Sequence, residues 1–328
     1  MERTTAKKNK YEIDMCNGTI MDKLISFSLP LMLSGILQLM FNAVDIIVVG
    51  RFSGSQALAA VGSTSALINV FTNLFIGISL GANVLTARFY AAGREKEVSE
   101  TVHTAITLAL VSGIVMALVG LVFSKGALAL MGTPDDVIGL SALYMRIYFL
   151  GMPFFMLYNY GAAILRAVGD TKRPLLFLMI AGVINACLNM VLVIVFKLGV
   201  AGVAIATVIS QMISCVLVLR CLCRSESSYR LRFSELGMKG YYLKQIFSVG
   251  VPAGIQSTVI NFSNVLLQSS VNSFGSTAMA GYTAANNLLG FLYVSVNSIT
   301  QACMSFTSQN YGVGKLKRMD RVLADCMI

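Results

Sequence analysis

A single carboxylate, Asp45, stands inside a long apolar run of the sequence, Phe41-Asn-Ala-Val-Asp-Ile-Ile-Val-Val-Gly50. Placing a charge at the centre of a bilayer costs about 2.5–3.5 kcal/mol, so an acid kept in a membrane-spanning segment is a candidate functional group. Burial favours the protonated form of a carboxylic acid, whereas the ionised form attracts cations. If this run spans a membrane, Asp45 predicts a site that binds and releases H⁺ or Na⁺. The alternative is a solvated position near the end of the run, beside Arg51.

Several polar side chains recur at helical spacing in apolar segments and could accompany Asp45. Residues three, four or seven apart share one face of a helix. Amides and hydroxyls in lipid-embedded helices usually face the bundle interior, because an unsatisfied polar group in hydrocarbon is costly. The candidate cation-coupling set is Asp45, Gln38, Asn42, Asn185, Asn189 and Thr207. The alternative is that these groups only hold neighbouring helices together.

A second group of residues is a candidate lining for an apolar cavity that adapts to its ligand, since methionine repacks easily. The candidates are Tyr144, Arg146, Tyr148, Met156, Tyr158, Asn159, Gln211 and Asn261. Ordinary core packing or lipid contact is the alternative, and Arg146 could instead snorkel to the membrane interface. Pro30 and Pro153 can kink helices, which makes them candidate hinges.

The elements that must position these residues are membrane-spanning helices. The chain has 328 residues, of which 56% are hydrophobic and only 12% are charged, whereas a soluble domain has about 25% charged residues. This composition excludes soluble enzymes, nucleic-acid readers and disordered chains. The apolar runs are continuous rather than alternating, which disfavours a β-barrel. Eight of them are long enough for a spanning helix: 24–50, 57–87, 102–124, 137–160, 175–196, 199–222, 245–274 and 278–308.

The distribution of basic residues predicts the orientation of these helices. With the N-terminus in the cytoplasm, the inside segments carry 21 of the 25 Lys and Arg residues, as expected from the positive-inside rule. We therefore expect a multi-pass protein of the cytoplasmic membrane, with no cleavable signal before the first helix. The expected divisions are a cytoplasmic tail at 1–23, a six-helix lobe at 24–222, a linker at 223–244 and part of a second lobe at 245–328.

The second lobe is expected because the chain contains a weak internal repeat. Gly54-Ser-Gln-Ala-Leu-Ala59 resembles Gly275-Ser-Thr-Ala-Met-Ala280, at an offset of 221 residues. The offset spans an even number of helices, so the repeats have the same orientation, as in transporters with two parallel lobes. At this offset a complete second lobe would end near residue 446 by a rough count, so we expect a truncated chain or a fragment of a longer protein.

The sequence contains none of the common signatures of a cofactor or an enzyme. The single histidine, His103, cannot build a zinc site with the seven scattered cysteines. There is no Walker A motif and no hydrolase motif. We therefore expect a protein that is not an enzyme, binds no cofactor, structural metal or nucleic acid, and is driven by an ion gradient. Its partners would be small molecules and the lipid bilayer, and we expect a monomer.

Four segments resemble signatures of the multidrug and toxic compound extrusion (MATE) family. They lie at 30–62, 81–93, 165–174 and 199–207, and the third reads Leu165-Arg-Ala-Val-Gly-Asp-Thr-Lys-Arg-Pro174. The resemblance implies an all-α polytopic membrane protein: a two-lobed helix bundle with a parallel internal repeat, whose second lobe is incomplete here. It also implies a secondary antiporter that exports cationic or amphipathic drugs against H⁺ or Na⁺.

Carried over by position, Asp45 matches the coupling acid of the family's first helix, and Gln38, Asn185 and Thr207 match its polar neighbours. The chain departs at Asn189, where prokaryotic members often have an aspartate, and this favours H⁺ over Na⁺. The seventh helix carries no acid, only Asn261 and Asn264. Two other interpretations stay open: a flippase for lipid-linked precursors with the related superfamily architecture, and an inactive transporter fragment.

Overall fold

The computed structural model describes residues 11–272 and 276–327, and within them it contains helices and loops but no strand. The all-α fold class predicted from the apolar runs is therefore confirmed. The long helices are α1 (Met21–Phe52), α2 (Ser55–Ala91), α3 (Glu95–Leu130), α4 (Asp135–Leu150), α5 (Met152–Ala167), α6 (Lys172–Asn189), α7 (Gly199–Cys223), α8 (Gly240–Asn272), α9 (Ser276–Gly312) and α10 (Leu316–Met327). A π-helical stretch, η1 (Met190–Val195), continues α6, and a short 3-10 helix, η2 (Phe233–Glu235), precedes α8.

The fourth apolar segment differs from its prediction as one helix, because the structure divides it into α4 and α5. The two helices meet at Gly151 with a bend of 47°. Pro153 occupies the first turn of α5, where its missing N–H costs nothing, whereas inside a helix it would break a hydrogen bond and clash with the preceding turn. Pro30, by contrast, lies within the continuous helix α1.

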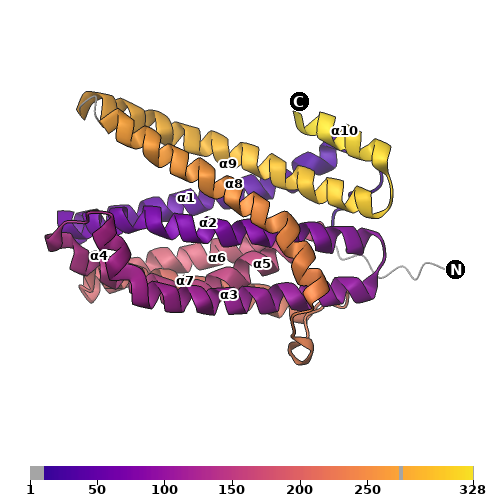
Figure 1. The fold of residues 1–328 in the computed structure, drawn as a ribbon, viewed down its shortest axis with the longest axis horizontal. Helices are drawn as coiled ribbons and strands as arrows, with labels where there is room; N and C mark the ends of the chain where they lie inside the picture. Colours follow the sequence, from indigo (N-terminus) through magenta and orange to yellow (C-terminus); the bar gives the residue numbers. More distant parts are fainter. Residues whose placement is uncertain (1–10, 273–275, 328) are drawn as a thin grey trace.

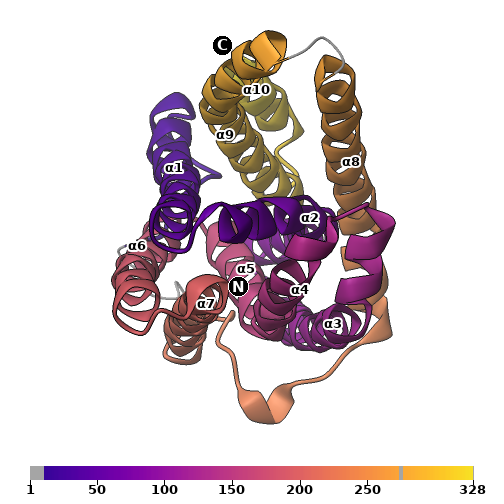
Figure 2. The same cartoon turned by 90° about the vertical axis from the view of Figure 1, so that its left-hand side faces the viewer.

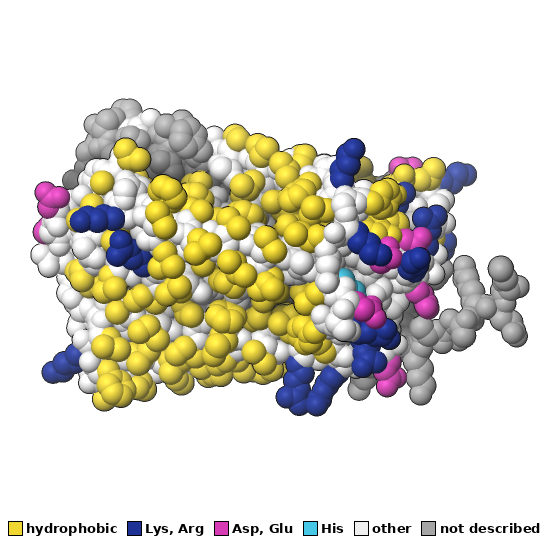
Figure 3. Space-filling model, turned by 60° about the horizontal axis from the view of Figure 1, so that its bottom comes forward, with side chains coloured by type: hydrophobic (Ala, Val, Ile, Leu, Met, Phe, Trp, Pro, Cys, Tyr) yellow, Lys and Arg dark blue, Asp and Glu magenta, His cyan; other side chains and the backbone are white. Residues whose placement is uncertain are grey.

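Six segments of the first seven helices are suited to cross a membrane. Helices α1, α2, α3, α7 and the continuous α6–η1 are each long and apolar enough, and the bent pair α4–α5 is the sixth when its two helices are counted as one span. Large hydrophobic side chains such as Leu118, Val122 and Phe123 of α3 are exposed. Figure 3 shows that such side chains cover the middle of one face, whereas Lys and Arg gather toward one end. We call this the basic end; α2 joins α3 there, and α5 joins α6.

Helices α8 and α9 lie against one side of the bundle formed by α1–α7 (Figures 1 and 2). Helix α8 packs on α2, and α9 packs on α1 and α2. The α2–α8 contact is a crossing of small residues: a Cβ atom at Gly77 would lie 2.2 Å from the Cα atom of Gly254. Small residues allow helix backbones to approach closely in membranes. Away from the basic end, α8 and α9 diverge from α1 and α2 (Figure 1).

The N-terminal segment does not hang free at residues 11–20, although the sequence places it in a polar tail. The Glu12 carboxylate accepts hydrogen bonds from the hydroxyl groups of Tyr90 (2.9 Å) and Tyr229 (2.8 Å). Burial raises the pKa of Tyr229, so its hydroxyl stays protonated and acts as the hydrogen-bond donor to Glu12. The backbone N–H of Ile13 donates to the carbonyl of Gly169 at 3.2 Å. The segment thereby ties α2, the α5–α6 loop and the connection to α8 together at the basic end.

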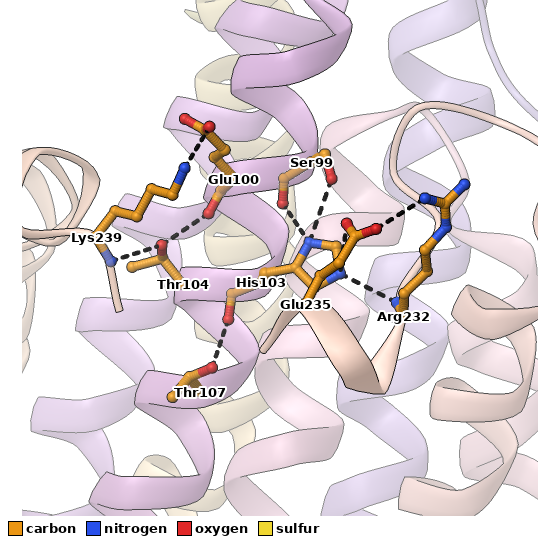
Figure 4. A network of polar contacts seen from close by, with 8 residues as sticks. All are labelled: Ser99, Glu100, His103, Thr104, Thr107, Arg232, Glu235 and Lys239. Carbon is orange, nitrogen blue, oxygen red and sulfur yellow. Dashed lines mark hydrogen bonds and ion pairs between the residues drawn. The ribbon is translucent and has the colours of Figure 1, made fainter. Parts of the chain in front are cut away.

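The connection between α7 and α8 is docked on α3 through the single histidine, His103 (Figure 4). The Nδ1 atom of this buried ring lies 2.6 Å from the carbonyl oxygen of Ser99, and Nε2 lies 3.1 Å from the backbone N–H of Arg232. Since Nε2 must accept from that N–H, Nδ1 carries the ring proton. A hydrogen bond from the Arg232 side chain holds the pKa of Glu235 below its usual range. An ion pair between Lys239 and Glu100 completes the docking.

Replacing His103 with leucine is expected to loosen this connection. The N–H of Arg232 would lose its acceptor, and a hydrogen bond of this kind contributes about 0.5–1.5 kcal/mol. We expect trypsin to cut after Arg230 and Arg232 about tenfold faster, since cleavage follows the population of the open form. Thr107→Val is the matched control, because the Thr107 hydroxyl bonds only to a carbonyl of its own helix. Equal cleavage rates for the two variants would contradict the docking role of His103.

Candidate functional site

The candidate site is built around Asp45, which lies half-buried on α1. The side-chain Nδ2 group of Asn189, at the end of α6, donates a hydrogen bond to Asp45 Oδ1. The same Nδ2 group donates to Asn185 Oδ1 at 3.1 Å. Both asparagines are buried. The carboxylate is therefore held by a donor on a different helix, which is how a charge in an apolar bundle is stabilised.

The polar contacts continue from α6 to α7. Asn185 Nδ2 donates to Thr207 Oγ1 at 3.4 Å, and the Thr207 hydroxyl donates to the carbonyl of Val203 at 3.0 Å. The chain of contacts from Asp45 thus joins α1, α6 and α7. The π-helical stretch η1 begins directly after Asn189, and π-bulges in helices frequently occur at functional sites.

The carboxylate faces a cavity of about 320 Å³, which we call the Asp45 cavity. Five helices of the bundle and the end of α4 line it. Among its described lining residues, Asp45 is the only one with a formal charge at neutral pH. Of the residues predicted from sequence, the lining includes Gln38, Asn42, Asp45, Tyr148, Tyr158, Asn159, Asn185, Thr207 and Gln211. This arrangement can bind a proton or a small cation in a polar, partly enclosed space.

Other predicted cavity residues lie elsewhere. The Arg146 side chain is exposed on α4, and Met156 is completely buried in the core. Tyr144 is buried and stacks on Tyr148, with ring centroids 6.1 Å apart. The side chain of Asn261 lies outside the described residues. The structure therefore places Tyr148 at the cavity and Tyr144 behind it.

The structure also brings polar residues of α2 to the Asp45 cavity that our sequence analysis did not single out. Asn69, Thr72 and Asn73 line it. Asn69 and Asn73 are four residues apart in an apolar run, which is the same signal that marks Asn185 and Asn189. That spacing alone could have identified them.

These features define a multi-pass α-helical membrane protein with a polar cavity inside its helix bundle. The chain belongs to the MatE family, whose family model matches residues 30–191 and 252–328. It is 35% identical over 306 residues to the "probable multidrug resistance protein YoeA" of Bacillus subtilis, an alignment that covers 90% of this chain and 66% of that protein. It is 24% identical over 305 residues to an "FAD transporter" of Shewanella oneidensis, which covers 92% of this chain and 67% of that protein.

Solved structures show the same fold. The outward-facing conformation of a multidrug resistance MATE family transporter matches with a TM-score of 0.89 and 22% sequence identity, and the match covers 98% of this chain and 71% of that one. A MATE transporter in the bent conformation matches with a TM-score of 0.90 at 22% identity, over 98% of this chain and 71% of the other. The chain thus spans about two thirds of the length of the curated relatives that it matches.

Proposed function

We propose that this chain acts as a secondary antiporter that exports cationic or amphipathic small molecules across the cytoplasmic membrane. Inward flow of H⁺, or of Na⁺, through Asp45 would supply the energy. The observation that carries the proposal is the hydrogen-bonded chain from Asp45 through Asn189 and Asn185 to Thr207 at the edge of a polar cavity. An acid placed there can change its charge when a cation arrives, and its helix α1 also packs on α9.

The basic end lies in the cytoplasm in this proposal, as the positive-inside rule favours. The divergence of α8 and α9 toward the other end then corresponds to an outward-facing state (Figure 1). A cation reaching Asp45 from outside would neutralise it and change the contacts of α1. Closure at the outer end and opening at the basic end would then release the cation inside and admit the next substrate.

The surroundings of Asp45 favour H⁺ over Na⁺ in this proposal. Sodium needs several oxygen ligands, whereas Asn189 directs its nitrogen toward the carboxylate. A proton needs only the one carboxylate.

Transport by the purified chain in lipid vesicles tests this function. We expect ethidium added outside to accumulate in vesicles with an acidic lumen, and nigericin, which dissipates the pH gradient, to abolish this accumulation. A matched set of vesicles with a Na⁺ gradient and no pH gradient distinguishes the two ions. Ethidium fluxes that ignore both gradients would contradict the antiport proposal.

A further inference from the structure

A second cavity, of about 380 Å³, lies between the bundle helices α1, α2 and α5 and the helices α8 and α9. We call it the interlobe cavity. Its polar lining is rich in amide side chains from both sides: Gln38, Asn42, Asn73, Asn159, Asn297 and Gln301. Leu39, Ile76 and Leu80 add an apolar surface. The cavity can therefore receive a molecule that has both a polar and an apolar part.

The cavity has one charged side chain in its described lining, Arg166. This residue lies in the last turn of α5, two turns after Asn159 on the same face of the helix. Its side chain is half-buried. Sequence position alone groups Arg166 with the basic residues of the following loop, whereas the helix continues to Ala167 and places Arg166 in the lining of the cavity.

Arg166 has no carboxylate partner within residues 11–272 and 276–327. The ion pairs of the described chain involve other residues. The nearest acid in sequence, Asp170, forms an ion pair with Arg173. Asp45 lies in the neighbouring cavity rather than in the lining of this one. Among the described residues, a positive charge therefore lines the interlobe cavity and no carboxylate does.

A guanidinium presents a planar fork of N–H donors that matches a carboxylate or a phosphate with two parallel hydrogen bonds. A cationic ligand, by contrast, would meet repulsion from Arg166, and the described lining offers it no acid. The amide side chains can serve either ligand, so the arginine decides the preference.

We propose that the interlobe cavity is a substrate site that binds the carboxylate or phosphate group of an amphipathic anion through Arg166. The apolar part of the molecule would lie against the leucine and isoleucine side chains, and the amides would bind its remaining polar groups. This proposal rests on the antiport function above. It concerns the amphipathic substrates of that function: those that bind in the interlobe cavity carry a negative group.

Binding of a fluorescent anion to the purified full chain in detergent tests the site. Fluorescence anisotropy would measure the affinity for 5-carboxyfluorescein, with ethidium as the cationic probe. We expect Arg166→Gln to weaken carboxyfluorescein binding about 10- to 100-fold, because a hydrogen-bonded charge contact is lost, and to leave ethidium binding unchanged or tighter. Arg166→Lys should retain part of the affinity, since it keeps the charge without the planar fork.

Arg146→Gln is the matched control, because it removes the same charge from an exposed position of α4. It should change neither affinity. Equal carboxyfluorescein affinities for Arg166→Gln and the unmodified chain would overturn the proposal. If Arg166→Gln does not fold, competition on the unmodified chain replaces it: benzoate and phenyl phosphate should displace the dye, and benzylammonium should not. Displacement by benzylammonium as good as by benzoate would overturn the proposal as well.

Two further arms separate the alternatives. Phosphatidylglycerol competing more strongly than phenyl phosphate would assign the site to a lipid headgroup and overturn the substrate assignment. The vesicle experiment tests the antiport proposal independently of this site. Gradient-driven ethidium uptake without Arg166-dependent anion binding would support the antiport proposal and overturn the anion site. Arg166-dependent anion binding without any gradient-driven uptake would support the anion site and overturn the antiport proposal.

Discussion

Replacing Asp45 with asparagine is expected to abolish gradient-driven accumulation of substrate in vesicles. The side chain keeps its shape but can no longer take up or release a proton. Proton flow is then no longer coupled to movement of the substrate. A pH gradient of about one unit supplies about 1.4 kcal/mol to the exchange of one H⁺ for one ethidium, which sustains an ethidium gradient of about tenfold. In vesicles with the variant, the ratio of inside to outside substrate concentration should fall to about one. Folding should persist, because Asn189 Nδ2 can donate to the amide oxygen as it does to Asp45 Oδ1.

Asp22→Asn is the control for this result. It makes the same change of acid to amide on the same helix, at an exposed position in the first turn of α1. Its accumulation should match that of the unmodified chain at equal protein content. Undiminished pH-driven accumulation by Asp45→Asn would remove this residue from the coupling mechanism, whatever the control does.

Replacing Asp170 with alanine is expected to destabilise the fold by about 3–5 kcal/mol, the cost of breaking a buried ion pair on one side. Asp170 is completely buried. Its Oδ1 atom accepts the backbone N–H of Arg173 at 3.1 Å, and its Oδ2 atom pairs with the Arg173 guanidinium. The variant leaves that guanidinium in the protein without its carboxylate. Thermal unfolding in detergent, followed by size-exclusion chromatography, measures the loss.

Asp136→Ala is the matched control, because Asp136 is an exposed acid in the first turn of α4. Its effect should stay below about 1 kcal/mol, the usual size of a helix-dipole contact. We also expect Asp170→Ala combined with Arg173→Met to be less destabilising than Asp170→Ala alone, since no charge is then left unpaired. Additive losses in the double variant would show that the two side chains stabilise the fold independently.

Much of the secondary structure follows from the sequence alone. Each of the eight apolar segments coincides with a helix or a bent pair of helices, because continuous hydrophobic runs can satisfy their backbone in a membrane only as helices. Most helices extend past the apolar runs; α3 starts at Glu95, seven residues before the predicted segment. Hydrophobicity marks only the part that lies in hydrocarbon, and the helix continues into the polar layer.

The candidate site, too, could be predicted from the sequence only in part. Helical periodicity places Asp45, Asn42 and Gln38 on one face of α1, and the acid inside the apolar run stands out because charge is so scarce in this chain. Periodicity does not say which face of another helix lies opposite. The contact from Asn189 to Asp45 joins residues 144 positions apart, and only the packing of α6 on α1 decides it.

The two arginines of the α4–α5 segment show most clearly that the sequence does not predict which way a helix face is turned. From the sequence, Arg146 inside the apolar run is the candidate for the cavity, and Arg166 belongs to a basic loop. The bend at Gly151 and the packing of α5 between α2 and α7 reverse these roles, because they turn Arg146 outward and direct Arg166 into the interlobe cavity. The sequence by itself determined the helices and the one intramembrane acid. Which side chains meet across the cavities was decided by tertiary packing, since the rotation of each helix depends on its neighbours.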